Sequence, residues 1–214
     1  MLRSIGQNAI GLGIFAVLTA GIIAWTQQST QHRIAENIDA AKIRLLNEVI
    51  PPNQHTNNLL DDSLIINDPD LLAGESPSPA YRARRDGEIV AVILPTVAPN
   101  GYTGKIQSLV GIDQEGNIIG VRVVSHQETP GLGDKVEAKK SDWVQQFTGR
   151  SLNDPLPQQW AVKKDGGAFD QLTGATITPR AVTASIRKAL DYFNEHKATL
   201  FDQDNDSVST AEEG

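Results

Sequence analysis

The chain has 214 residues, a formal net charge of −7 and a hydrophobic content of 39%. This length suffices for one ordinary domain with a buried core plus an appendage. With a net negative charge, the chain lacks the basic surface that is typical of a nucleic-acid-binding protein. The absence of cysteine excludes disulfides, thiolate metal sites, cysteine-ligated iron–sulfur clusters and cysteine nucleophiles. The 4 histidines are scattered, so no dedicated metal site is expected.

The first predicted element is a membrane-spanning helix. Residues 4–31 carry no charged side chain, and Ala9–Trp25 reads AIGLGIFAVLTAGIIAW. A spanning helix needs about 20 mostly apolar residues, and Trp25 stands where an interfacial aromatic anchor would stand. A cleaved signal peptide is the alternative, but the apolar run is long for one and no clean A-x-A site follows. We therefore predict that residues 1–29 are a retained N-terminal membrane anchor.

Residues 30–79 are predicted to join this anchor to a domain. Apolar residues recur at three- and four-residue spacing in its first part: Ile34, Ile38, Ala41, Leu45 and Val49. This spacing predicts an amphipathic helix that is continuous with the anchor and is ended by Pro51 and Pro52. Residues 51–79 are rich in Pro, Asn, Asp and Ser, and they are expected to form an irregular connector.

Residues 80–200 are predicted to form an α+β domain in which helices flank an antiparallel sheet. Strands are expected at Ile89–Leu94, Ile106–Ile112, Ile118–Ser125 and 160–162, with turns at residues 85–87 and 113–117. Helices are expected at Val136–Phe147 and Pro179–His196, the second with an inward face of Val182, Ile186, either Ala189 or Leu190, and Phe193. Residues 201–214 are an acidic, Ser-rich tail that is predicted to be disordered.

A glycine loop, SHQETPGLG, follows the third of these strands at residues 125–133. Gly131 and Gly133 leave the backbone accessible, which lets N–H groups approach a flat ligand closely. His126 and Glu128 occupy alternate positions, so an extended chain would project both to the same side. A planar polar ligand is one interpretation; an ordinary strand-to-helix connector is the other, and composition alone favours the connector.

A second glycine turn, PNGYTGKI, precedes the strand at 106–112. Its Tyr102 could stack on an aromatic ligand. A tyrosine in such a turn is more often an ordinary rim residue, so by itself it does not identify a site.

The stretch DQLTGATITP, residues 170–179, places several hydroxyls before the last predicted helix. Thr178 is expected to cap that helix, with Pro179 as its first residue. The exposed N–H groups of a helix N-terminus favour an anion such as a phosphate, and Gly174 lets the preceding chain turn. The hydroxyls of Thr173, Thr176 and Thr178 would all lie near that anion. A reversibly bound phosphate, a phosphate ester on a hydroxyl and a capped helix without ligand all remain open from these residues.

The order of four segments resembles a known family. GYTGKIQSLVG, HQETPGLGDK, SDWVQQFTG and WAVKKDGGAFDQLTGATITPRAV follow one another as in the FMN-binding domain of bacterial ion-translocating electron-transport complexes. The chain most resembles the RnfG (RsxG) family of the Rnf complex, and the related FMN-binding subunit of the sodium-translocating NADH:quinone reductase is the runner-up. The resemblance extends from the anchor nearly to Phe193, and its most specific motif is DxxTGAT at residues 170–176.

This resemblance implies a covalently bound FMN, attached through its phosphate to the hydroxyl of Thr176. It also implies a separate flavin transferase that reads the motif containing Asp170. The flavin ring would lie against the glycine loop. The complete set of expected FMN-binding residues is Tyr102, His126, Glu128, Thr129, Gly131, Leu132, Thr173, Gly174, Ala175, Thr176 and Thr178.

The function implied by the resemblance is that of an electron-transfer subunit without stand-alone catalysis, so no acid, base or nucleophile is assigned. Its partners would be the other flavin and iron–sulfur subunits of the complex, the flavin transferase and membrane lipid. The family places the flavin domain on the periplasmic side of the bacterial inner membrane. Three basic residues follow the anchor, Arg33, Lys42 and Arg44, and Arg3 alone precedes it. Because basic residues concentrate on the cytoplasmic side, this count would place the main domain in the cytoplasm. We follow the resemblance and expect the domain in the periplasm. The alternatives are a reversible phosphate-ligand module and a structural scaffold.

Overall fold

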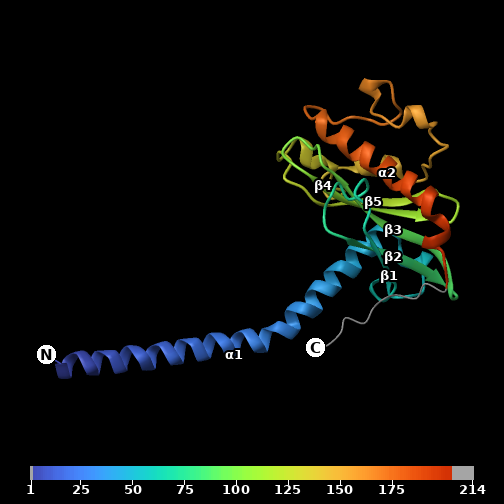
Figure 1. The fold of residues 1–214 in the computed structure, drawn as a ribbon. Coiled ribbons are helices and arrows are strands. Elements are labelled where there is room, and N and C mark those ends of the chain that lie inside the picture. Colours follow the sequence, from blue (N-terminus) through green and yellow to red (C-terminus); the bar gives the residue numbers. More distant parts are fainter. Residues whose placement is uncertain (1, 204–214) are drawn as a thin grey trace. The chain divides into compact units, whose positions relative to one another are not determined.

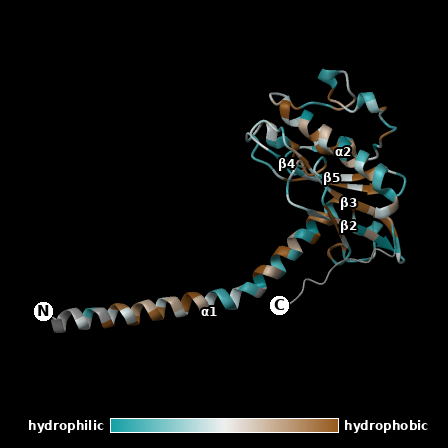
Figure 2. Cartoon of the chain, in the orientation of Figure 1, coloured by the Kyte–Doolittle hydropathy of each residue, from teal (hydrophilic) through white to brown (hydrophobic). Residues whose placement is uncertain are grey.

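The computed structural model describes residues 2–203, which fall into two compact units divided between Lys42 and Ile43. Helix α1, Leu2–Val49, makes up the described part of the first unit and continues into the second. Within the described residues it is the one helix long and apolar enough, over Ile10–Val49, to cross a membrane. Figure 2 shows its hydrophobic run. The predicted continuity of anchor and following helix is confirmed, and α1 ends just before the two prolines, as expected.

The second unit is built on an antiparallel sheet of five strands in the order β1-β2-β3-β4-β5 (Figure 1). The strands are β1 (Ser63–Ile66), β2 (Ser78–Arg85), β3 (Glu88–Ala98), β4 (Ile106–Asp113) and β5 (Ile118–Ser125). The predicted α+β class is confirmed, and so are the three strands predicted at Ile89–Leu94, Ile106–Ile112 and Ile118–Ser125, which correspond to β3, β4 and β5. The expectation of an irregular segment at 51–79 is wrong where β1 pairs with Ser78–Tyr81. The four residues of β1 are too few to show a strand periodicity in the sequence.

Two hairpins follow from turn chemistry and confirm the predicted turns. Asp86 and Gly87 join β2 to β3 with φ angles of 55° and 90°, the positive values that suit the right-handed twist of a hairpin. Between β4 and β5, the Asp113 carboxylate accepts a hydrogen bond of 2.8 Å from the Asn117 amide. Both turns keep consecutive strands paired, so the sheet is a simple meander.

Helix α2, Ile177–Leu200, covers one face of the sheet over β3 and β4 (Figure 1). Its predicted inward face is confirmed, since Val182, Ile186, Leu190 and Phe193 are all buried. The buried Thr96 hydroxyl of β3 donates a 3.0 Å hydrogen bond to the Ser185 carbonyl of α2. This bond and the apolar packing fix the helix along the sheet, and therefore fix where its N-terminus lies.

The end of α1 packs on the other face of the sheet. Leu46, Val49 and Ile50 are buried there against alternate residues of β3, Ala91 and Ile93, because successive strand residues point to opposite faces. Earlier residues of the predicted amphipathic stripe do not follow this pattern: Ile34 and Ile38 are 54% and 49% exposed. The stripe is therefore buried only at its last turn.

A pair of glycines makes this contact possible. Gly111 of β4 is the direct partner of Gly120 of β5. A Cβ atom at Gly120 would lie 2.6 Å from the Val49 carbonyl oxygen, and one at Gly111 would lie 2.8 Å from the Val49 Cγ1 atom. We call these two residues the glycine pair; it is the surface on which the end of α1 rests.

The segment between β5 and α2 contains short 3-10 helices in place of the predicted elements. They are η3 (Gly133–Val136), η4 (Asp142–Phe147), η5 (Pro157–Gln159) and η6 (Lys163–Asp165); η1 (Pro52–Gln54) and η2 (Leu59–Asp61) lie before the sheet. The single helix predicted at Val136–Phe147 is wrong, because the Ser141 hydroxyl accepts from the Trp143 amide and starts a new helix there. The strand predicted at 160–162 is also wrong: Val162 forms only an isolated bridge to Phe169.

Aromatic packing explains why this segment is compact without long elements. The fully buried Phe147 ring lies 4.6 Å from Phe169, 5.3 Å from Trp143 and 6.3 Å from Trp160, measured between ring centroids. Such rings bury large apolar areas and contribute additional pairwise attraction. The predicted disordered tail lies largely outside the described residues, which end at Gln203.

Candidate functional site

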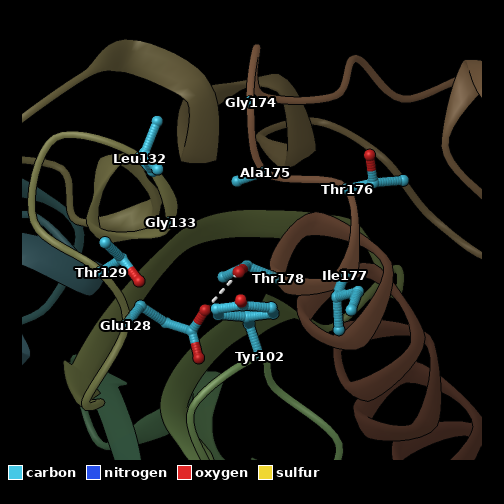
Figure 3. Close-up of a pocket in the computed structure, with 10 residues that line it drawn as sticks. All are labelled: Tyr102, Glu128, Thr129, Leu132, Gly133, Gly174, Ala175, Thr176, Ile177 and Thr178. Atoms are coloured by element: carbon cyan, nitrogen blue, oxygen red, sulfur yellow. Dashed lines mark hydrogen bonds between the residues drawn. The ribbon is translucent and has the colours of Figure 1, made fainter.

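A pocket of about 370 Å³ lies between the glycine loop that follows β5 and the chain that enters α2 (Figure 3). Its volume falls within the range of small-molecule sites, which is about 300–1,000 Å³. Its lining consists of Tyr102, Glu128, Thr129, Leu132, Gly133, Gly174, Ala175, Thr176, Ile177 and Thr178. Three motifs that are distant in sequence therefore meet at one cavity.

A buried carboxylate forms part of this pocket. Glu128 is 4% exposed. One carboxylate oxygen accepts a 3.1 Å hydrogen bond from the Thr103 amide and lies 3.2 Å from the Thr103 hydroxyl. The other oxygen accepts from the Thr178 hydroxyl, a bond drawn in Figure 3. Glu128 thus connects the turn at residues 101–104, the glycine loop and the first turn of α2.

Two glycines make room for this carboxylate. A Cβ atom at Gly101 or at Gly133 would lie 2.8 Å from one of the two Glu128 carboxylate oxygens. At Gly101 the backbone is closer still, since the Gly104 carbonyl oxygen would lie 2.2 Å from the added Cβ, and at Gly133 the Thr178 hydroxyl would lie 2.8 Å away. Gly133 is therefore fitted to the Glu128–Thr178 pair, whereas Gly101 is required first by the backbone of its own turn.

The start of α2 differs from the prediction. The helix begins at Ile177, with Thr176 as its N-cap residue, and the Thr176 side chain makes no capping hydrogen bond. The predicted Thr178 cap is wrong: Thr178 lies inside the helix, is 1% exposed and donates to Glu128. Pro179 is accordingly the third helical residue. The buried carboxylate recruits the Thr178 hydroxyl, and the Thr176 hydroxyl is left at the edge of the pocket (Figure 3).

The TGAT turn packs directly on the glycine loop. Gly174 has a φ of 81°, a conformation that favours glycine. A Cβ atom there would also lie 2.9 Å from the Leu132 side chain. The two loops could not approach this closely with a larger residue at position 174.

A polar cluster holds the far side of the glycine loop. His126 Nε2 lies 2.7 Å from a Glu137 carboxylate oxygen, and the Lys140 ammonium contacts Asp134 at 3.0 Å and Glu137 at 2.9 Å. The hydrogen bonds from Lys140 lower the pKa of the Asp134 and Glu137 carboxyls, and the two carboxylates raise the pKa of Lys140. We call these four residues the loop-support cluster.

The structure brings most of the predicted site residues together, but not all. Of the eleven, Tyr102, Glu128, Thr129, Leu132, Gly174, Ala175, Thr176 and Thr178 line the pocket, whereas His126, Gly131 and Thr173 do not. The His126 ring accepts from the Glu128 amide and turns to Glu137, so the expected common orientation of His126 and Glu128 is wrong. The sequence analysis missed Gly133 and Ile177 as lining residues.

The predicted recognition residue Asp170 lies outside the pocket, on the surface. Its carboxylate is 65% exposed and forms a 2.5 Å ion pair with Lys163. Its backbone is held more firmly, since its carbonyl accepts from the Trp143 indole and its amide donates to the Gln146 side chain, each at 2.6 Å. The backbone is fixed while the carboxylate remains accessible to a partner.

The pocket combines features that suit a planar ligand with a phosphate. The N-terminus of α2 offers unpaired N–H groups and a partial positive charge, which favour an anion. Exposed apolar side chains stand around the opening, with Tyr102 at 65%, Leu132 at 42% and Ile177 at 44% exposure. Fold and site together define an α+β ligand-binding domain whose pocket accepts a phosphorylated, partly aromatic molecule.

Comparisons with known proteins identify the family. The FMN-binding domain family matches residues 101–191, and the RnfG N-terminal region matches residues 1–49. The G subunit of the ion-translocating oxidoreductase complex of Pseudomonas aeruginosa is 50% identical over 198 residues, which cover 92% of each chain. The protein of the same name from Shewanella loihica is 46% identical over 203 residues, covering 95% of this chain and 96% of that one. The chain belongs to this family, the G subunits of ion-translocating oxidoreductase complexes.

A solved structure was also found. The crystal structure of Shewanella oneidensis NqrC aligns with a TM-score of 0.47 and 22% identity, covering 71% of this chain and 72% of that chain.

The pocket residues fit FMN. The helix N-terminus provides a place for the phosphate, and the apolar opening provides a place for the ring system. Gly133 and Gly174 keep side chains out of the space between the two loops.

Proposed function

We propose that this chain is a redox subunit that carries FMN as a phosphate ester on Thr176 and relays electrons within an ion-translocating oxidoreductase complex. The observation that carries this proposal is the position of Thr176. Thr176 lies at the N-terminus of α2 and lines the pocket, and its side chain makes no capping hydrogen bond. Among the three threonines of this stretch, Thr178 is buried and bound to Glu128, and Thr173 does not line the pocket.

The chain's own residues bind and orient the cofactor. The N–H groups of Ile177 and Thr178 and the dipole of α2 would stabilise the phosphate, whereas Pro179 has no N–H to contribute. Tyr102, Leu132 and Ile177 would hold the ring system, while Gly174 and Ala175 keep the connecting turn narrow. Thr129 and Gly131 belong to the glycine loop. His126 stabilises this loop through its contact with Glu137, on the side away from the pocket. FMN, when bound, supplies the electron chemistry, and the protein supplies position and electrostatics.

Maturation requires a flavin transferase in this proposal, because FMN itself is a phosphomonoester and does not esterify a hydroxyl in water. The transfer needs a donor that carries the flavin phosphate in a phosphoanhydride, whose P–O bond breaks as the bond from the Thr176 oxygen to that phosphorus forms. The accessible Asp170 carboxylate, on a fixed backbone, is the feature this transferase would recognise, and Thr173 belongs to the same motif. The relatives are named as subunits of a complex, so we assign other flavin and iron–sulfur subunits as partners.

We further propose that α1 is retained as a single-pass anchor in the inner membrane, with the FMN domain on the periplasmic side. Its length and apolar composition support the anchor. A reporter fused to the C-terminus tests the side: activity of a periplasm-dependent reporter is expected, and activity of a cytoplasm-dependent one would contradict the assignment.

The ester is tested by producing the full chain together with an active flavin transferase. The wild-type chain should show a flavin-fluorescent band after denaturing electrophoresis and a mass increased by one esterified FMN, mapped to the peptide that contains Thr176. Thr176→Ala should lose both signals, because no hydroxyl remains, whereas Thr176→Ser retains a hydroxyl and should keep them. Thr199→Ala, at an exposed position near the other end of α2, is the matched control.

Two results would contradict the proposal in different ways. An unmodified wild-type mass with FMN released on denaturation would show reversible binding. An esterified FMN that persists in Thr176→Ala would place the attachment at another residue.

A further inference from the structure

The carboxylate of Glu128 has an unusual environment for a buried charge. Its hydrogen-bond donors are uncharged: the Thr103 amide and the Thr178 hydroxyl, with the Thr103 hydroxyl nearby. Among the described residues, no lysine, arginine or histidine forms an ion pair with it, and Lys140 of the loop-support cluster is engaged by Asp134 and Glu137. Glu128 therefore brings into the pocket a carboxylate that is held by uncharged donors and by the N-terminal turn of α2, without a side-chain cation as ion-pair partner among the described residues.

The geometry shows that this charge is built into the pocket. Glu128 is 4% exposed and lines the cavity. Gly133 leaves the space that its carboxylate and the Thr178 hydroxyl occupy. Buried carboxylates without a charged partner are costly and uncommon, and a loop that served only to connect β5 to η3 would not need one. Its hydrogen bonds tie three segments together, and its carboxylate also faces the cavity.

The effect of such a charge on a redox ligand follows from Coulomb's law. A negative charge raises the energy of any added negative charge nearby, and the effect is larger in a site from which water is excluded. Glu128 lines this pocket, so the part of a ligand that contacts it is not separated from the carboxylate by a screening layer of solvent, whose Debye length is about 8 Å at physiological ionic strength. Charge and hydrogen bonding near a cofactor are established means of setting its potential.

We propose that Glu128 lowers the reduction potential of the FMN in this pocket, and so makes the reduced cofactor a stronger electron donor to the next carrier. The inference rests on the proposed binding of FMN. The role is electrostatic: Glu128 need not transfer a proton. Thr178 and Thr103 are positioning residues that hold the carboxylate against the pocket.

The test is a potentiometric titration of the flavinylated full chain, with dithionite as reductant and soluble mediators, followed by flavin absorbance. Glu128→Gln keeps the shape of the side chain and removes its charge. The midpoint potential of the FMN in this variant should rise by at least about 30 mV, which is a tenfold change in the equilibrium constant of a two-electron couple. Glu128→Asp keeps the charge and should stay close to wild type. Glu195→Gln removes the same charge at an exposed position of α2 and should leave the potential unchanged.

The outcomes separate this inference from the proposed function. A flavinylated Glu128→Gln chain with the wild-type potential would overturn the inference and leave the FMN assignment intact. Equal shifts in the Gln and Asp variants would also overturn it, since they would report a structural role. A wild-type chain that carries no flavin would overturn the proposed function instead.

A second variant covers the case in which Glu128→Gln does not fold. Thr178→Val removes one hydrogen-bond donor that favours the charged form of the carboxyl, so less negative charge faces the pocket and the potential should rise above wild type, in the same direction as in Glu128→Gln. A potential equal to or below wild type in that variant would count against the inference.

Discussion

Replacement of Gly120 by alanine tests how the end of α1 is held on the sheet. The added Cβ would lie 2.6 Å from the Val49 carbonyl oxygen, whereas ordinary carbon–oxygen contacts are about 3.3–3.6 Å. The overlap is thus roughly 0.7–1 Å, and it involves backbone, which cannot rotate away. The φ angle of Gly120 lies outside the left-handed region, so the penalty is steric and not torsional.

The size of the effect can be estimated from overpacking of cores. Forcing an extra methyl group into a well-packed site costs about 1–3 kcal/mol. In a chain of this length, each kcal/mol lowers the melting temperature by about 2–4 °C, so a decrease of about 2–12 °C is expected. Thermal and urea denaturation of the full chain in detergent, followed by circular dichroism, measure it. Gly21→Ala, whose new Cβ meets nothing within 4 Å, should be nearly silent.

A double-mutant cycle identifies the contact. At Gly111 the nearest atom to the added Cβ is the Val49 Cγ1, at 2.8 Å, so Val49→Ala should partly rescue Gly111→Ala. The same change should not rescue Gly120→Ala, because there the obstacle is the Val49 backbone. Additive energies at both positions, or a Gly120→Ala chain as stable as wild type, would refute the idea that the glycine pair seats α1.

Two further predictions concern the segment between β5 and α2. Phe147→Ala removes a fully buried ring from contact with three aromatic neighbours and should cost about 3–5 kcal/mol; urea denaturation followed by tryptophan fluorescence measures this, and a cost below about 1 kcal/mol would contradict the packing. Lys140→Met removes the cation that lowers the pKa of Asp134 and Glu137. Carboxyls with lowered pKa stabilise the fold above their ordinary pKa, about 4, and lose that contribution as the pH falls through their folded values. The variant should therefore be less stable than wild type at neutral pH, with a difference that shrinks below about pH 4 in acid titrations of stability; a difference that is constant with pH would contradict the assignment.

Local patterns in the sequence were sufficient for much of the fold. The apolar run predicted α1, the turn residues predicted the turn before β3 and the β4–β5 hairpin, and the period of apolar residues predicted the buried face of α2. Strand β2 was not predicted. These features depend on interactions within a few residues, so a single sequence displays them. The short strand β1 and the 3-10 helices were not predictable in the same way, because partners distant in the chain stabilise them.

The same distinction between local patterns and contacts of distant residues applies to the candidate site. The glycine loop, the TGAT turn and a helix start with an anion-favouring N-terminus were all readable from the sequence, and the family resemblance named Thr176. Glu128 was a candidate from its position alone. Its partners in Thr103 and Thr178 lie 25 and 50 residues away, so no local pattern links them.

The sequence by itself therefore determined that this chain has an apolar helix followed by an α+β domain, and which motifs belong to its ligand site. Only the tertiary structure decided what each hydroxyl of that site does. Once Glu128 is buried between two glycine turns it requires a donor, and the fold supplies Thr178 for this purpose. In the folded chain α2 starts at Ile177, and Thr176, its N-cap residue, lies at the edge of the pocket without a side-chain capping bond, which is why we propose its hydroxyl as the one that carries the phosphate.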